Sequence, residues 1–136
     1  MKPKDSISSR VTYVLDTSAL IAYLAQEEGG DRLKQLRSSA ALPFIVLTEL
    51  YYVVARKQGQ TLADDTVHYV LAWHLPILTA DERISLSAGY LKSQYQLGIA
   101  DSYIAAFAIA HSATLVTKDS DFRILEPTVT LMYLGT

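Results

Sequence analysis

Short apolar runs rich in β-branched and aromatic residues recur along the chain, separated by longer and more polar segments. Runs of this kind are typical of strands that are buried on both faces of a parallel sheet. They predict five strands, at 11–15, 41–46, 76–79, 114–117 and 130–134.

Between these runs, apolar residues recur at the three- and four-residue spacing of amphipathic helices. This spacing predicts helical segments at 19–26, 31–38, 48–57, 61–74, 81–95 and 100–112. Thr48 is the expected N-cap of the third segment, and Gly59 is its expected stop. The last segment contains five alanines, which are small enough to let a helix lie close against a sheet.

The alternation of strands and helices determines the predicted fold class. Consecutive parallel strands need crossover connections, so the pattern predicts an α/β fold with a mostly parallel sheet and helices on both faces. A chain of 136 residues fits one domain, and we expect a polar tail at 1–10 followed by a single domain at 11–136. Ligands of such sheets bind beyond the carboxyl ends of the strands, so we expect the functional residues at that edge.

Composition excludes several kinds of site. The chain has no cysteine, which excludes disulfides, thiolate zinc sites and a cysteine nucleophile. Its net charge is −2, so any binding of nucleic acid would depend on a local basic rim and not on the whole surface. The first ten residues are polar, unlike a secretory signal, and no apolar stretch approaches the roughly 20 residues of a membrane helix. We therefore expect a cytoplasmic protein that does not associate with a membrane.

Acidic residues follow the predicted strands at the expected ligand-binding edge. Asp16 directly follows the first strand, and Glu49 begins the helix after the second strand. Asp119 follows the fourth strand, with Asp121 two residues further on, and Asp101 lies in the first turn of the alanine-rich helix. If the sheet is parallel, the side chains of Asp16, Glu49, Asp101 and Asp119 can point into one crevice.

Each of these acids also has a structural explanation. Asp16, Glu49 and Asp101 lie at predicted helix starts, where carboxylates cap the helix or complement its dipole. Asp119 could be a turn residue. However, these local roles do not require that the acids share one edge of the sheet.

Clustered carboxylates favour a divalent cation, because like charges a few ångströms apart cannot all stay ionised unaided. Mg²⁺ and Mn²⁺ prefer oxygen ligands and often bind carboxylates together with phosphate oxygens. Such ions activate water and neutralise a leaving oxygen, as the hydrolysis of phosphodiesters requires. The candidate basic rim consists of residues close to these acids in the sequence, for which a solvated surface is the alternative interpretation: Arg56, Lys57, Lys118 and Arg123.

Four blocks of the sequence resemble the signatures of the PIN-domain family. VLDTSALIAYL resembles the opening block, in which an aspartate after the first strand precedes a Thr/Ser pair, and LTELYYVVAR resembles the second. LGIADSYIAAFAIAHSATLVTKDSDF resembles the third and fourth together. The blocks follow the family's order over residues 11–134, and within the family they look most like VapC toxins of toxin–antitoxin pairs.

This resemblance implies a three-layer α/β/α sandwich with a five-stranded parallel sheet and an Mg²⁺- or Mn²⁺-dependent endoribonuclease. It also implies a homodimer and a VapB-type antitoxin whose C-terminal segment blocks the active site. Asp16 and Asp101 would be the main metal ligands, and Glu49 and Asp119 would support them or hold a second ion. The supporting residues would be Thr17, Ser18, Thr117 and the secondary acid Asp121.

Two other functional classes compete with this interpretation. A receiver-like signalling domain also gathers acids at the ends of parallel strands, but it needs an acidic pair after the first strand. Here Thr17 and Ser18 follow Asp16, and the third predicted strand ends without an acid. A non-catalytic PIN-like scaffold that binds RNA without cutting it is disfavoured by the complete set of acids.

Overall fold

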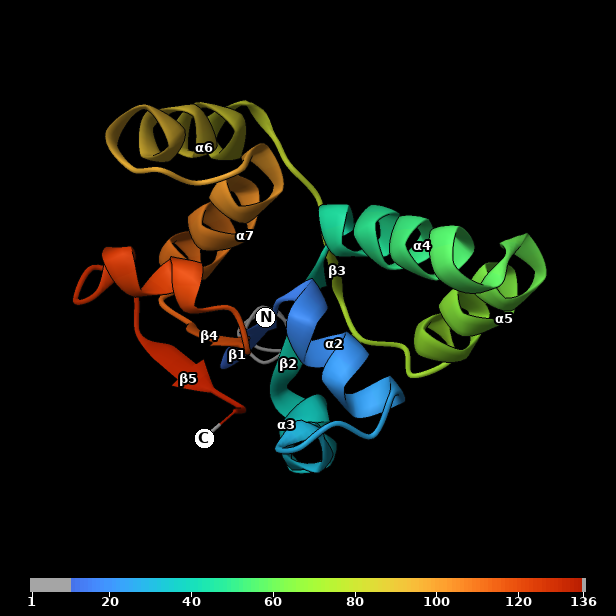
Figure 1. Cartoon of the computed structure of the whole chain (residues 1–136). Helices are drawn as coiled ribbons and strands as arrows, with labels where there is room; N and C mark the ends of the chain where they lie inside the picture. The colour runs from blue at the N-terminus through green and yellow to red at the C-terminus, as the bar shows by residue number, and fades with distance from the viewer. Residues whose placement is uncertain (1–10, 136) are drawn as a thin grey trace, which may run out of the picture.

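A single sheet of five strands runs through the middle of the molecule (Figure 1). The computed structural model describes residues 11–135, and the tail expected at 1–10 lies outside the described residues. The strands are β1 (Tyr13–Leu15), β2 (Ala40–Pro43), β3 (Ile77–Leu78), β4 (Thr114–Thr117) and β5 (Leu131–Tyr133). Their order is β3-β2-β1-β4-β5, and every neighbouring pair is parallel. The predicted α/β class with a parallel sheet is therefore confirmed.

Helices flank the sheet and complete the α/β/α arrangement. The α-helices are α2 (Thr17–Leu24), α3 (Leu33–Leu36), α4 (Phe44–Gln58), α5 (Gln60–Leu71), α6 (Glu82–Gln94) and α7 (Ile99–Ala110). Short 3₁₀ helices are η1 (Gly30–Arg32), η2 (Arg37–Ser39) and η3 (Ser120–Leu125). Within residues 11–135, no helix combines the length and the apolar character needed to cross a membrane.

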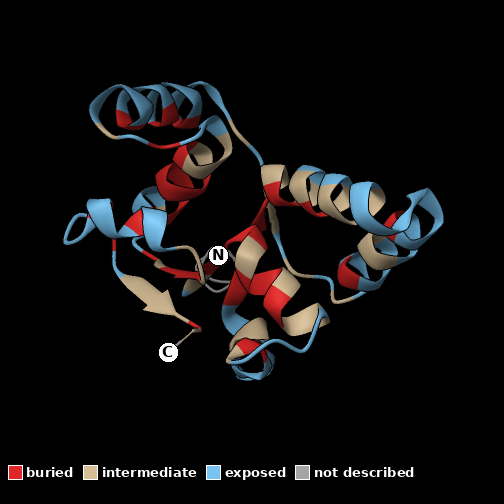
Figure 2. Ribbon diagram, in the orientation of Figure 1, coloured by how far each residue is buried: buried red, intermediate tan, exposed pale blue. Residues whose placement is uncertain are grey.

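The core lies between the sheet and helix α7, as the buried ribbons at the centre of Figure 2 show. Helix α7 contacts β1, β2 and β4, and its residues 104–108 are all buried. Three of these five are alanines, whose small side chains allow the close approach to the sheet that the sequence predicted. The core also includes fully buried Val14, Leu15 and Leu115 from the central strands, and Leu20 and Leu33 from α2 and α3.

The second strand is shorter than predicted, and the helix after it begins earlier. We predicted a strand at 41–46 and a helix starting at Thr48, but β2 ends at Pro43 and α4 already begins at Phe44. Pro43 has an extended backbone and occupies the N-cap position. The β-type residues after it become helical because tertiary packing outweighs local preference: Phe44 packs edge-on against Phe107, with ring centroids 6.2 Å apart.

Two smaller differences also affect the site. Helix α2 begins at Thr17 and not at Ala19, so its first turn follows Asp16 without a gap. The 3₁₀ helix η3 was not predicted, and it makes Asp119 an N-cap residue.

The strand order explains where a site can form. The chain passes from β1 outward through β2 and β3, and then returns to the other side of β1 to form β4 and β5. The order therefore reverses between β1 and β4, which is where open parallel sheets bind ligands. The ladder between these strands extends to Asp16, whose N–H donates to the carbonyl of Val116 at 3.0 Å.

The end of the chain packs against the loop after α2. Arg32 donates from Nη1 to the carbonyl of Tyr133 at 3.1 Å, and Leu134 donates its N–H to Thr117 at 2.9 Å. Gly29 has φ +84°, and a Cβ at this position would lie 1.6 Å from the carbonyl oxygen of Leu134. Only glycine fits here, since it tolerates this backbone conformation and leaves room for the neighbouring strand.

Gly29→Ala should therefore lower the free energy of unfolding by about 2–5 kcal/mol, from the left-handed backbone and the forced shift of β5. The midpoint of urea unfolding measures this loss. Gly89→Ala is the matched control, because Gly89 lies inside α6 and a Cβ there meets nothing within 4 Å. The control should stabilise the protein by up to about 1 kcal/mol, and equal effects of the two variants would contradict this packing.

Candidate active site

The predicted acids lie on four different elements around the reversal of strand order. Asp16 directly follows β1, and Asp119 is the second residue after β4. Asp101 is the third residue of α7, and Asp121 lies in η3. Glu49 lies in the second turn of α4 and not in its first, because the helix begins earlier than predicted.

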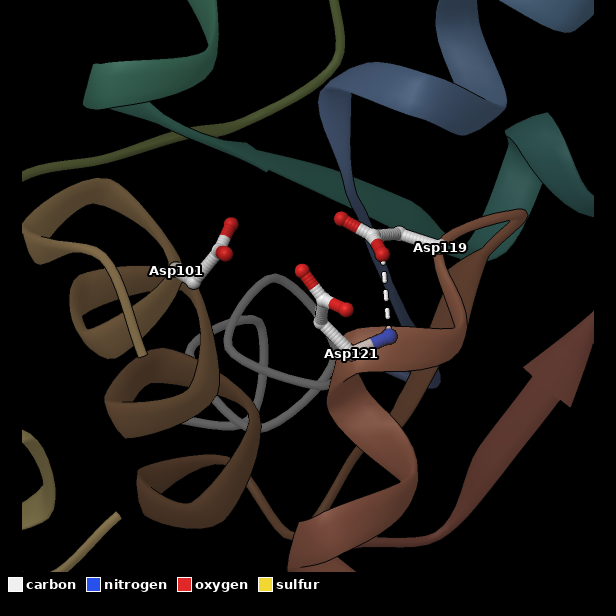
Figure 3. Close-up of side chains that lie close together, drawn as sticks. All are labelled: Asp101, Asp119 and Asp121. Atoms are coloured by element: carbon white, nitrogen blue, oxygen red, sulfur yellow. Dashed lines mark hydrogen bonds between the residues drawn. The ribbon is translucent and has the colours of Figure 1, made fainter. Parts of the chain in front are cut away.

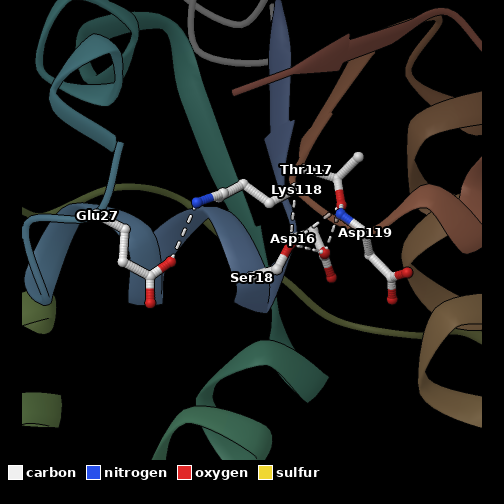
Figure 4. Close-up of polar contacts among 6 residues, drawn as sticks. All are labelled: Asp16, Ser18, Glu27, Thr117, Lys118 and Asp119. Atoms are coloured by element: carbon white, nitrogen blue, oxygen red, sulfur yellow. Dashed lines mark hydrogen bonds and ion pairs between the residues drawn. The ribbon is translucent and has the colours of Figure 1, made fainter. Parts of the chain in front are cut away.

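Asp16 is held by two hydroxyl groups at the buried end of β1 (Figure 4). Only 3% of Asp16 is exposed. Ser18 Oγ donates to Asp16 Oδ2 at 2.6 Å, and Thr117 Oγ1 donates to the same oxygen at 2.7 Å. Both hydroxyl groups thus donate to the same oxygen, Oδ2.

The same hydroxyls bind the loop that carries the next acid. Ser18 Oγ accepts from the N–H of Lys118 at 2.8 Å, and Thr117 Oγ1 accepts from the N–H of Asp119 at 2.9 Å. Ser18 and Thr117 therefore connect the end of β1 to the end of β4. Their positions support the role of polar helpers that the sequence suggested for them.

Thr17 orients Glu49, the acid on α4. Its Oγ1 donates to Glu49 Oε1 at 2.6 Å, across the gap between α2 and α4. Thr17 is itself 7% exposed and Glu49 is half-buried, so this hydrogen bond is partly shielded from solvent. The Thr-Ser pair after Asp16 therefore contacts two different carboxylates.

Asp101, Asp119 and Asp121 form a close group of carboxylates. Asp101, Asp119 and Asp121 point toward one another in Figure 3, and one carboxylate oxygen of each lies within 4.8 Å of the others. Asp119 Oδ1 also accepts from the N–H of Asp121 at 2.9 Å, which fixes the start of η3. The structure therefore brings both Asp119 and the secondary acid Asp121 to Asp101.

Burial and the neighbouring negative charges both disfavour the ionised form of these acids. Burial raises the pKa of Asp101 from 3.8 to about 7, and neighbouring negative charges add to the rise. The charges that act on Asp101 are those of Asp16, Asp119, Glu49 and Asp121.

Burial also raises the pKa of Asp16, and the charge of Glu49 contributes in the same direction. Hydrogen bonds from Ser18, from Thr117 and from the backbone of Thr17 oppose this rise. Ionised carboxylates at this edge therefore need a compensating positive charge.

The donor set fits a hard divalent cation. The charged neighbours that act on Asp101 are all carboxylates, and oxygen is the donor that Mg²⁺ and Mn²⁺ prefer. Asp101 and Asp119 are partly buried and Asp121 is exposed, so the group is accessible from solvent. An ion bound here would be within reach of a substrate.

The predicted basic residues divide into two groups. Lys118 and Arg123 are close in sequence to Asp119 and Asp121, at the end of β4 and in η3. Arg56 and Lys57 lie in the last turn of α4, about 10 Å along the helix axis from Glu49. Arg56 there hydrogen-bonds Tyr52 on the surface.

Comparisons with known proteins agree with this architecture. A family model described as "PIN domain" matches residues 13–126. No curated protein matches the chain significantly.

Several solved structures with similar folds are VapBC complexes. The chain is 25% identical to a chain of VapBC2 from Rickettsia felis bound to promoter DNA, with a TM-score of 0.73 and coverage of 90% of this chain and 98% of that one. It is 18% identical to a chain of DNA-bound VapBC from Salmonella typhimurium, with a TM-score of 0.75 and coverage of 91% of this chain and 98% of that one. It is 22% identical to a chain of VapBC-5 from Mycobacterium tuberculosis, with a TM-score of 0.64 and coverage of 93% of this chain and 99% of that one.

The raised pKa of Asp101 predicts that stability in EDTA falls with rising pH. Between pH 3.8 and about 7 the folded protein keeps a proton that the unfolded chain loses, so the free energy of unfolding decreases across this range. Asp101→Asn should flatten the dependence and melt at a higher temperature than the parent at pH 8. Thermal unfolding followed by circular dichroism at pH 5 to 8 tests this.

Asp64→Asn is the control for this experiment, because Asp64 is exposed on α5. It should leave the pH profile of the parent unchanged. A parent protein that is as stable at pH 8 as at pH 5, or an Asp101→Asn variant with the parent's profile, would contradict the electrostatic argument.

Proposed function

The chain belongs to the PIN-domain family, and from this premise we propose that it is a metal-dependent endoribonuclease, the toxin of a type II toxin–antitoxin pair. One observation carries the proposal: the carboxylate oxygens of Asp101, Asp119 and Asp121 lie within 4.8 Å of one another, and Asp16 and Glu49 are close enough to raise the pKa of Asp101. Local roles such as helix capping do not account for this convergence.

We assign the main metal-binding roles to Asp16 and Asp101. Glu49 and Asp119 support them or hold a second ion, and Asp121 is an additional acid at the exposed side of the group. When bound, Mg²⁺ or Mn²⁺ would supply the positive charge that activates water and stabilises the leaving oxygen during phosphodiester hydrolysis.

The protein's own contribution is to preorganise the carboxylates. The hydroxyls of Ser18 and Thr117 hold one oxygen of Asp16, and Thr17 holds one oxygen of Glu49. Each carboxylate therefore keeps a defined orientation before substrate binds, which lowers the reorganisation needed during the reaction. The alternative of a non-catalytic RNA-binding scaffold does not explain why hydroxyl groups orient the acids.

The partners follow from the family resemblance. We propose a VapB-type antitoxin, because the similar solved structures include VapBC complexes from several bacteria. An apolar groove of about 680 Å³ between α2, α4 and α5 offers a surface for the helix of such a partner; its lining includes Ile21, Leu50, Val53, Leu62 and Tyr69. The homodimer is proposed from the resemblance alone, and the cytoplasmic site of action from the sequence pattern described above.

Asp101→Asn should reduce Mg²⁺- or Mn²⁺-dependent cleavage of RNA by at least about 100-fold, because it removes a proposed ligand charge. Cleavage of a labelled total-RNA preparation, with EDTA as the blank, measures the loss. Asp64→Asn is the charge-matched control and should cut like the parent. Full activity of Asp101→Asn would refute the assignment, and absence of cleavage by the parent with either metal would favour the scaffold.

Divalent metal should also stabilise the folded protein, since it binds the carboxylate group only when the group is assembled. At a concentration about 100 times the dissociation constant, the gain is about 2.7 kcal/mol. A calorimetric scan with and without millimolar Mn²⁺ measures it at pH 7.5. The gain should disappear in Asp101→Asn, and a parent whose melting temperature ignores the metal would count against a preformed site.

A further inference from the structure

We propose that the RNA strand leaves the active site over the end of β5, along a basic track formed by Arg32, Lys118 and Arg123. The inference rests on the proposed nuclease function and adds the path of the substrate to it. It adds Arg32 to the predicted basic rim and removes Arg56 and Lys57 from the substrate surface.

Three cations from separate segments converge on residues 133–135. The guanidinium of Arg123 lies over the ring of Tyr133, 4.2 Å from its centroid. Arg32 donates to the carbonyl of the same residue at 3.1 Å. The side chain of Lys118 passes close to Gly135, with Cε 3.6 Å from the position of a Cβ built there.

The track begins at the acids themselves. Lys118 and Asp119 are adjacent, and the N–H of Lys118 binds Ser18 within the network that holds Asp16. Arg123 is two residues from Asp121 in the same 3₁₀ helix. Arg32 and Arg123 are exposed, and Lys118 is partly exposed. All three are therefore open to a strand that crosses residues 133–135, while the backbone of Lys118 and the helix η3 connect this surface to the acids.

An RNA strand that reaches the carboxylates needs positive side chains beside its phosphates. The chain carries a net charge of −2 and concentrates five carboxylates at the site, so phosphates next to the scissile one are repelled unless positive side chains lie beside them. On the α4 side, the predicted cations are about two helical turns beyond Glu49. On the β5 side, Lys118 is next to Asp119 in the sequence, and Arg123 is two residues from Asp121.

The ion pair of Lys118 does not prevent its use by RNA. Its Nζ lies 3.2 Å from Oε1 of Glu27, and the two side chains are 25% and 46% exposed. Exposed pairs of this kind contribute at most about 1 kcal/mol, so a phosphate can replace Glu27. Glu27 is therefore a competitor of the phosphate for Lys118, which predicts opposite effects of changing the two residues.

The experiment measures the binding of a labelled single-stranded RNA of about 12 nucleotides to the Asp101→Asn protein in Mg²⁺, as a function of KCl. Each neutralised phosphate contact contributes about 0.7 to the slope of log K against log salt. Arg32→Gln, Lys118→Gln and Arg123→Gln should each reduce the slope by about 0.7. Glu27→Gln should strengthen binding, because it removes a negative charge and releases Lys118.

Arg83→Gln is the matched control, since Arg83 is exposed in the first turn of α6 and carries the same charge. It should change neither slope nor affinity. Arg56→Gln should behave like this control. Unchanged slopes in the three track variants, or weaker binding in Glu27→Gln, would overturn the proposed path, even if a track variant such as Arg32→Gln were destabilised.

The outcome can be separated from failure of the nuclease proposal. If the parent protein leaves the same labelled RNA intact in both Mg²⁺ and Mn²⁺, the nuclease function is wrong, and this is visible on a gel whatever the slopes are. If the parent cuts the RNA and the track variants bind like Asp101→Asn alone, only the path is wrong. If they lose affinity for an acidic peptide and not for RNA, the surface serves a protein partner and the path is also wrong.

Discussion

The repulsion among carboxylates at the carboxyl ends of β1 and β4 is the constraint on which the site depends. Asp16 is almost fully buried, and burial of a carboxylate is unfavourable unless it is hydrogen-bonded or paired. The structure meets this requirement with hydroxyls from Ser18 and Thr117, which have no charge of their own. The hydroxyls orient Asp16 without neutralising it, so the negative potential of the crevice persists and can attract a cation.

The parallel sheet makes this convergence possible. Since the strand order reverses between β1 and β4, residues 101 positions apart, Asp16 and Thr117, meet through one hydrogen bond of 2.7 Å. The end of the chain then closes the same edge, where Leu134 binds Thr117 and packs against Gly29. The site is therefore assembled by long-range contacts, and changes in the packing around β5 can reach it.

Much of the fold was predictable because the strands are apolar runs and helix α7 is rich in alanine. The predicted acids lie where the parallel topology required. The prediction failed at 44–46, where β-type residues are helical, because Phe44 finds its partners on α7 and not along a strand. The role of Arg32 was also out of reach, since its contact with Tyr133 joins residues 101 positions apart without a local signal.

An acid of the site can also stabilise the helix in which it lies. An acid without a capping role in its helix is therefore stronger evidence for a functional site. Asp119 does cap η3, and Asp101 does lie in the first turn of α7, so either could be present for its helix alone. Asp16 is different: it occupies the N-cap of α2 but makes no side-chain cap hydrogen bond. Glu49 lies beyond the first turn of α4, where the helix dipole gives little benefit. Among the described residues, neither Asp16 nor Glu49 therefore makes a side-chain capping hydrogen bond, and both accept hydrogen bonds from hydroxyls of α2.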